Sequence, residues 1–520
     1  MSSTLSNPRP PMPQFRLPVR TEEPGEGPTY RHILKSTALV GGSSILKIAV
    51  QIIRTKAMAI LLGPGGFGLF GLYGAVSDLW LSVAGMGVNS SGVRQIAEAA
   101  GSGNIAKIAK TTAVLRRTSI MLGIIGSLLL AIFSKSVSTL TFGGPQHSTA
   151  IAVLSIVILF RLISDGQAAL IQGKRRIADL AKMNAIGAIS GTLISIPMVY
   201  MLGEDGVVPS LVAVAATTIL TSWWYSRKIQ IPPAPVTLRE VGEEAASLLK
   251  LGFVFMSSGL MTMGAAYIVR VLLLRKLGVG AAGLYQSAWT LGGLYVGFIL
   301  QAMGADFYPR LTASSKNDTE CNRLVNEQAL VGLLLAGPGL IATLTFAPLV
   351  IYLFYSAKFG AAGSILRWIC LGTTLQVISW PMGFIIIAKA RKGFYFVAEF
   401  VWAVAAVILA WTCITYFGLT GAGMAFFASY GFHAVLIYSI VRHLSGFRWS
   451  PGMIHTSMVF LVLLAAVTAA IGFLPVIPAS CIGAVALGVS CVYSIHTLRA
   501  LVGSAYLPRP LAVLWGRTAF

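Results

Sequence analysis

The sequence predicts an all-α polytopic membrane protein of about 14 transmembrane helices, with two parallel-repeat six-helix bundles followed by two further helices. Of the 520 residues, 56% are hydrophobic and only 11% are charged, and the mean hydropathy is +0.78. A soluble globular protein has about 25% charged residues, so this chain cannot cover a water-facing surface. Its apolar runs are continuous rather than alternating, which favours membrane helices over a β-barrel.

An internal repeat with a period of about 215 residues supports the same prediction. Arg54 and Arg94 lie 40 residues apart, and so do Arg270 and Arg310. Each pair encloses a glycine-rich turn, which is LLGPGGFG in the first copy and KLGVGAAG in the second. A turn flanked on both sides by equally spaced arginines indicates two copies of one unit.

The first bundle is expected over residues 32–228. Its six spans are predicted at 36–62, 67–93, 109–133, 148–172, 178–201 and 207–226. Residues 1–31 precede them and are rich in Pro, Ser, Gly and charge. They lack the apolar core of a signal peptide, so we expect a disordered tail.

A linker rich in proline and charge, residues 229–247, leads to the second bundle at residues 248–445. The six spans of this bundle are predicted at 249–277, 283–308, 328–355, 363–388, 394–417 and 421–441. Two extra helices, 453–475 and 480–502, fill residues 446–505, and residues 506–520 form a second tail.

Lysine and arginine gather in alternate loops. Counted from a cytoplasmic N-terminus, the inner loops hold Lys174–Arg176, Arg227–Lys228 and Arg391–Lys392, while Arg275–Lys276 and Lys358 are exceptions in the short outer loops. Positive residues accumulate in cytoplasmic loops, so both termini are expected there. The same bias explains most of the net charge of +22, and no nucleic-acid partner is expected. Each repeat has an even number of spans, so both copies enter the membrane in the same direction.

Charged residues inside the predicted spans are the candidate functional groups, because a charge at the centre of a membrane helix costs about 3 kcal/mol. Lys47 and Arg54 share one helical face with Ser43 and Gln51, which predicts a helix that lines an aqueous path. The alternative is that the long side chains reach the membrane surface, which is more compatible with Arg54 than with Lys47. Arg270 is the matching cation in the second copy.

Three further charges lie within spans. Arg161 and Asp165 are four residues apart, so they can form either a structural ion pair or a gating pair. Asp78 is alone in its span, and it can pair with Lys47 or Arg54 or hold a proton or Na⁺. We therefore take Asp78 and Asp165 as candidates for gating or ion coupling.

Cations outnumber carboxylates in this set. A cavity lined by Lys47, Arg54, Arg161 and Arg270 would attract an anionic substrate. Phosphate or pyrophosphate is the expected class, because guanidinium groups suit phosphate oxygens. The sequence contains no CxxC pair, no large outer loop and no constellation of nucleophile and base, so neither an enzyme nor a metal site is expected. No cofactor is expected apart from a coupling ion, H⁺ or Na⁺.

The run IIRTKAMAILLGPGGFGLFGLYGAVSDLW resembles the opening of bacterial O-antigen flippases, the Wzx-type polysaccharide transporter family. LGVGAAGLYQSAWTLGGLY, followed by FYPRL, is similar to the matching second segment. The family belongs to the superfamily that also contains lipid II flippases and multidrug and toxin extrusion (MATE) antiporters. The resemblance covers about residues 30–445, and the last two helices match only as generic spans.

The resemblance implies a protein of the bacterial inner membrane that moves undecaprenyl-pyrophosphate-linked oligosaccharides outward by alternating access through a cationic central cavity. By motif position Arg54 corresponds to a cavity cation that meets pyrophosphate, and Arg270 lies one residue out of step with the motif. The implied partners are the lipid-linked substrate, membrane lipids and other polysaccharide assembly proteins. The alternative is a MATE-type ion-coupled exporter of small organic molecules, which would need an acidic cavity.

Overall fold

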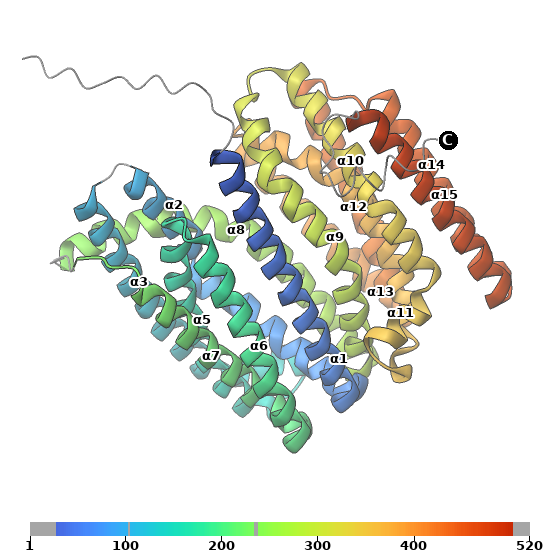
Figure 1. The fold of residues 1–520 in the computed structure, drawn as a ribbon. Coiled ribbons are helices and arrows are strands. Elements are labelled where there is room, and N and C mark those ends of the chain that lie inside the picture. Colours follow the sequence, from blue (N-terminus) through green and yellow to red (C-terminus); the bar gives the residue numbers. More distant parts are fainter. Residues whose placement is uncertain (1–27, 102–103, 233–237, 503–520) are drawn as a thin grey trace, which may run out of the picture.

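The computed structural model describes the backbone of residues 28–101, 104–232 and 238–502 (Figure 1). The expected tail at 506–520, most of the tail at 1–31 and the centre of the linker lie outside these residues. Two boundaries differ from expectation. Helix α1 begins at Pro28, since proline suits the first turn of a helix, where its missing N–H would have no partner. Helix α8 begins at Leu238, inside the expected linker, where Leu, Glu and Ala favour helix.

Within the described ranges the chain is helical and has no strand. The elements of the first half are α1 (Pro28–Gly85), α2 (Val88–Gly101), α3 (Ile105–Ile132), α4 (Ser134–Phe142), η1 (Pro145–His147), α5 (Ser148–Gly173), α6 (Ile177–Leu202), η2 (Gly203–Gly206) and α7 (Val207–Arg227). Those of the second half are α8 (Leu238–Leu277), α9 (Val279–Ala313), α10 (Asp318–Thr345), α11 (Ala347–Phe354), η3 (Ala357–Phe359), α12 (Ala362–Ala388) and α13 (Lys392–Ser445). They are followed by α14 (Pro451–Phe473) and α15 (Val476–Val502), at the outer edge of the second half in Figure 1.

The backbone repeats the 215-residue period of the sequence. Residues with positive φ recur at this spacing in three pairs, which are Gly63 and Gly278, Arg175 and Ala390, and Gly203 and Gly418. The helix starts repeat too: Asn104 caps α3 by accepting from the backbone N–H of Lys107, and Asn317 caps α10 in the same way. These matched turns confirm that the second half copies the first.

Kinks explain why predicted pairs of spans lie on single elements. Helix α1 bends at Gly63, with φ 63°, and α13 bends at Gly418, with φ 59°. Glycine adopts positive φ at little steric cost, so the chain can turn sharply there. The predicted spans 36–62 and 67–93 thus meet at one bend, and 394–417 and 421–441 meet at the other.

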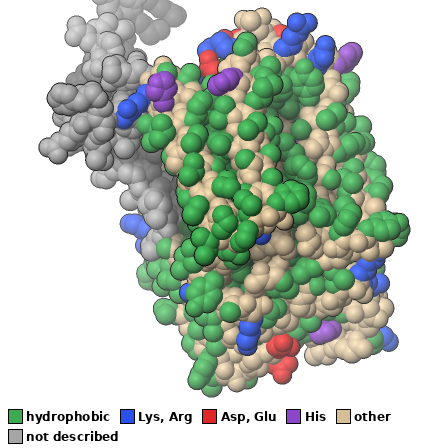
Figure 2. Space-filling model, turned by 90° about the vertical axis from the view of Figure 1, so that its right-hand side faces the viewer, with side chains coloured by type: hydrophobic (Ala, Val, Ile, Leu, Met, Phe, Trp, Pro, Cys, Tyr) green, Lys and Arg blue, Asp and Glu red, His purple; other side chains and the backbone are tan. Residues whose placement is uncertain are grey.

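Nine segments of the described chain are long and apolar enough to cross a membrane. Three of them each hold two predicted spans: Ile48–Gly85, Ile177–Arg227 and Gly393–Ser445. The predicted spans 249–277 and 283–308 lie on α8 and α9, outside these nine. Hydrophobic side chains cover the middle of the face drawn in Figure 2, and most charged side chains lie toward its ends. The chain is therefore a multi-pass, all-α membrane protein.

The halves meet closely where α1 bends and α9 begins. A Cβ on Gly68 would collide with the carbonyl oxygen of Val279, and a Cβ on Gly283 would collide with the carbonyl oxygen of Pro64. The two contacts are copies of each other, because Val279 and Gly283 each lie 215 residues after their counterparts. Only glycine permits such a close backbone approach.

An aromatic cluster reinforces the same junction. Phe67 is only 2% exposed, and its ring centroid lies 5.5 Å from that of Tyr355 and 5.7 Å from that of Phe359. Both contacts are edge-on, the geometry that aromatic pairs prefer. This end of the molecule is therefore closed in the structure.

Candidate functional site

A cavity of about 390 Å³ lies within the first half and reaches α8. Its charged lining residues are Asp78 on α1 and Arg161 and Asp165 on α5, and Met256 and Met263 of α8 contribute apolar side chains. The predicted coupling candidates therefore line one cavity, together with one of the four predicted cations. The formal charge of its lining is −1, because two carboxylates face one guanidinium.

The ion pair in this cavity differs from the one expected. Arg161 Nη1 donates to Asp78 Oδ1 at 2.7 Å, so Arg161 pairs across the bundle rather than with Asp165 on its own helix. The expected pairing of Asp78 with Lys47 or Arg54 is likewise absent among the described contacts. A spacing of four residues places two side chains on one helical face, but the tertiary packing places Asp78 closer. No described cation lies within 4.0 Å of the Asp165 carboxylate, although Arg161 is close enough to interact with it electrostatically.

Arg54 lies on α1, outside the lining of this cavity. Its guanidinium carbon is 5.7 Å from the ring centroid of Phe70. Its Nε and Nη2 atoms are buried, and no acceptor for either exists among the described residues. Buried polar groups in native proteins almost always have a partner, so an exception calls for an explanation.

Arg270 of α8 is buried as well, at 8% exposure, but its partners are present. Nε donates to Gln286 Oε1 at 2.8 Å, and Nη1 donates to the carbonyl oxygen of Ala266 at 2.9 Å. Its guanidinium carbon also lies 5.6 Å from the ring centroid of Trp289. Arg270 is thus satisfied by the protein itself.

The three predicted cations whose side chains are described do not line one common cavity in this structure. Arg161 lines the cavity, while Arg54 and Arg270 lie near α9, where Gln286 packs against Gly71 beside Phe70. Lys47 belongs to α1, but its side chain lies outside the described residues. The functional roles of all six candidates stay predictions.

The second half contains a smaller cavity at matching positions. Its volume is about 140 Å³, and it is lined by Gly293 and Gln376, which lie 215 residues after Asp78 and Arg161. Val296, Gly297 and Leu300 correspond in the same way to Leu81, Ser82 and Gly85 of the first cavity. The second half therefore repeats the position of the cavity without its charges.

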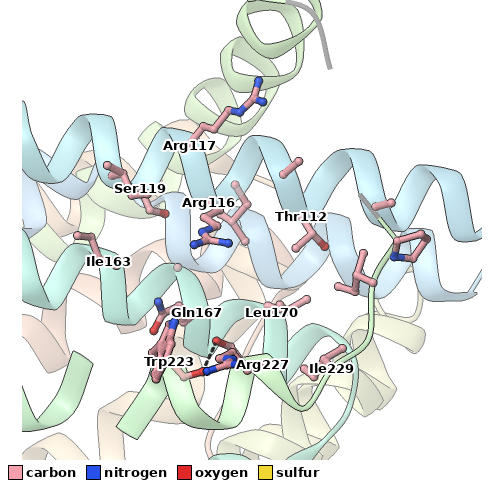
Figure 3. A pocket seen from close by; sticks show the side chains of 18 residues that line it. Thr112, Arg116, Arg117, Ser119, Ile163, Gln167, Leu170, Trp223, Arg227 and Ile229 are labelled. Atoms are coloured by element: carbon pink, nitrogen blue, oxygen red, sulfur yellow. Dashed lines mark hydrogen bonds between the residues drawn. The ribbon is translucent and has the colours of Figure 1, made fainter. Parts of the chain in front are cut away.

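Sequence reasoning missed a third cavity, of about 490 Å³, near the end of α7. Arg116, Arg117 and Arg227 line it, and Figure 3 shows Arg116 directed toward Gln167. The signal was present in the sequence, because Arg116 and Arg117 interrupt the apolar run 109–133.

Comparisons with known proteins agree with this architecture. The lipid III flippase of Escherichia coli (strain K12) is 22% identical over 409 residues, which cover 76% of this chain and 95% of the relative. The solved structure of the lipid II flippase MurJ in an inward closed conformation has a TM-score of 0.68 at 14% identity, covering 88% of this chain and 99% of that chain.

An inward-facing multidrug resistance MATE family transporter of the MOP superfamily has a TM-score of 0.64 at 18% identity, covering 77% of this chain and 98% of that chain. These solved structures share the fold of this chain. The expected resemblance to polysaccharide transporters is confirmed by the flippase relative and by the family match. The relative is named a flippase, and the two solved structures are a flippase and a MATE family transporter. Residues 57–363, more than half of the chain, match the family described as "Polysaccharide biosynthesis protein", and the chain belongs to that family.

Proposed function

We propose that the protein flips an undecaprenyl-pyrophosphate-linked oligosaccharide, an O-antigen or related surface polysaccharide repeat unit, across the bacterial inner membrane. The family match and the relative named lipid III flippase, 95% of whose length is covered, support this class of substrate. The termini and the ends of α5 and α7 would face the cytoplasm, in line with the positive residues there. Membrane lipids and other polysaccharide assembly proteins are the further partners that this role requires.

The unpaired guanidinium of Arg54 carries the proposal. A buried donor without an acceptor costs about 1–3 kcal/mol, and more when it is charged. A phosphate oxygen of the substrate would supply the missing acceptor and form a charge-assisted hydrogen bond. Arg54 is thus the residue that we assign to the pyrophosphate, whereas Arg161 and Arg270 already have partners in the protein.

Alternating access would proceed by rocking of the two halves about their junction. The glycine contacts and the Phe67 cluster close the end that would face the periplasm. Opening this end requires the matched contacts between Gly68 and Val279 and between Gly283 and Pro64 to separate together. The cavity with Asp165 lies in the half that moves against α8, so an ion bound there would differ in exposure between the two states.

Asp165 is the stronger candidate for ion coupling, because Asp78 already neutralises Arg161. An unpaired carboxylate in a cavity can take up H⁺ or Na⁺ and release it when its surroundings change. The Arg161–Asp78 pair would hold the neighbouring charges in place. We propose the coupling role for both Asp165 and Asp78, with Asp165 as the first to test.

The test is complementation of a bacterial strain that lacks its own flippase. Wild-type protein should restore surface polysaccharide, whereas Arg54→Ala and Arg54→Lys should both fail, since Lys cannot form the forked contact of a guanidinium with phosphate. Protein levels in the membrane are measured alongside. Full restoration by both variants would remove Arg54 from the substrate site.

One observation favours the second candidate, a MATE-type exporter of organic cations. The cavity of Asp78, Arg161 and Asp165 has a net negative lining with methionine side chains, which suits a small apolar cation. Expression in a drug-susceptible host separates the two functions. Increased resistance to cationic dyes, lost in Asp165→Asn and without restoration of polysaccharide, would establish export in place of flipping.

A further inference from the structure

The third cavity lies between α3, α5 and α7, at the end of the first half where α7 terminates (Figure 3). Its volume of about 490 Å³ falls within the range of small-molecule sites. Ser119 and Gly166 line both this cavity and the one that contains Asp165. These two residues pack closely between the cavities, because a Cβ on Gly166 would collide with the Ser119 hydroxyl.

The charge of this cavity has one sign. Among the described residues its lining includes three arginines and no carboxylate. Arg117 points away from the other labelled side chains and has interactions elsewhere, whereas Arg116 reaches toward Gln167 (Figure 3). Neither Arg116 nor Arg227 has a hydrogen-bond acceptor or a carboxylate partner within the part of the chain that the structure describes. Two exposed guanidiniums without a protein partner among the described residues therefore line one cavity.

Neighbouring residues orient the site. The Arg227 guanidinium carbon lies 4.6 Å from the ring centroid of Trp223, a cation–π contact that limits its rotation. Ser222 donates to Gln167 Oε1 at 2.6 Å, which leaves the Gln167 amide N–H groups directed elsewhere. The Thr112 hydroxyl is buried and unpartnered among the described residues. The cavity thus offers several donors, and an anion with several oxygen acceptors would satisfy them.

We propose that this cavity is a second anion site that binds a phosphate-bearing group, either soluble phosphate or pyrophosphate or the headgroup of an anionic lipid. Guanidinium groups form forked, charge-assisted hydrogen bonds with phosphate oxygens. No described lining residue is a carboxylate that would oppose this attraction. Binding at this site does not depend on transport, so the proposal can be tested separately from flipping.

The test uses full-length protein in nanodiscs of phosphatidylcholine, with inorganic pyrophosphate as the probe and thermal unfolding as the readout. Wild type should be stabilised by pyrophosphate, and the double variant Arg116→Gln/Arg227→Gln should bind about 100-fold more weakly at this site. Arg442→Gln/Arg448→Gln is the matched control, because it removes the same charge from exposed positions that do not line the cavity.

A second arm distinguishes the source of the phosphate. If a lipid headgroup binds, nanodiscs that contain phosphatidylglycerol should raise the unfolding temperature of wild type and of the control more than that of the Arg116/Arg227 variant. If the ligand is soluble, pyrophosphate should produce this difference instead. Either result supports the site. Thr112→Val replaces only the hydroxyl by a methyl group and should weaken binding of the same probe severalfold. This variant tests the site if the double variant does not fold. Equal responses of all variants to both probes would overturn the proposal.

Discussion

The two halves share a backbone but not a charge distribution. Both contain a cavity at matching positions, yet Asp78 and Arg161 in the first half are replaced by Gly293 and Gln376 in the second. The first cavity is also the larger, at about 390 Å³ against about 140 Å³. Duplication therefore accounts for the framework, and of these two cavities only the one in the first half has the charges that ion coupling would need.

The arginines near the junction differ in a related way. Arg54 and Arg270 are copies of each other, one residue out of step. Arg270 is buried, and Arg54 is partly buried, with its Nε and Nη2 atoms inaccessible to solvent. Arg270 is satisfied by Gln286 and Ala266, whereas two nitrogens of Arg54 have no acceptor among the described residues. We infer that one copy stabilises the fold and that the other awaits a ligand.

The largest expected effect tests this contrast directly. Arg54→Met should lower transport about 100-fold, because one charge-assisted contact of about 1.5–3 kcal/mol with phosphate is lost. It should not lower the unfolding temperature in detergent, since no internal hydrogen bond is broken. Arg270→Met should lower that temperature, because Gln286 loses its partner. If Arg54→Met lowers the unfolding temperature as much as Arg270→Met does, the inferred difference between the two arginines is wrong.

The next effect concerns what the halves have in common, the closed junction. Gly283→Ala should destabilise the closed state by about 1–3 kcal/mol, since its Cβ would collide with the Pro64 carbonyl. Thiol labelling of a cysteine introduced near Phe67 should then become faster. Gly280→Ala, on the same helix, is the control, because no atom lies within 4 Å of the position that its Cβ would take. Equal labelling in both variants would argue against the glycine contact as the closing element.

The framework was predictable from sequence because glycine turns and apolar lengths are local features. The bend at Gly63 and its copy at Gly278 followed from the repeated turn. The pairing of Arg161 was not predictable, because Asp165 is near in sequence whereas Asp78 becomes near only after α1 packs against α5. The third cavity was not predicted for the same reason, because Arg116 and Arg227, which both line it, lie more than 100 residues apart in the sequence.

A smaller effect is expected at Asp165, which has no charged counterpart in the second half because Trp380 occupies the matching position. Asp165→Asn should make transport roughly tenfold slower in the presence of an ion gradient, with little loss in its absence. Transport in proteoliposomes with and without imposed H⁺ and Na⁺ gradients measures this. Undiminished gradient dependence in Asp165→Asn would exclude it as the coupling group.

The smallest effect is expected for the Asp78–Arg161 pair. Both side chains are about half exposed, at 53% and 39%, so solvent screens their attraction. A double-mutant cycle with Asp78→Asn and Arg161→Gln should give a coupling free energy below about 1 kcal/mol in thermal or denaturant unfolding. A value of several kcal/mol would mean that the first cavity depends on its charges for folding, unlike its neutral copy.

Flipping itself is measured most directly in proteoliposomes that contain a fluorescent undecaprenyl-pyrophosphate oligosaccharide in both leaflets. The readout is the fraction that an added membrane-impermeant reagent modifies over time. Wild-type protein should expose the inner-leaflet pool, and Arg54→Met should leave it protected at the rate of protein-free vesicles. Exposure at the wild-type rate by Arg54→Met, or no exposure by wild type, would contradict the account.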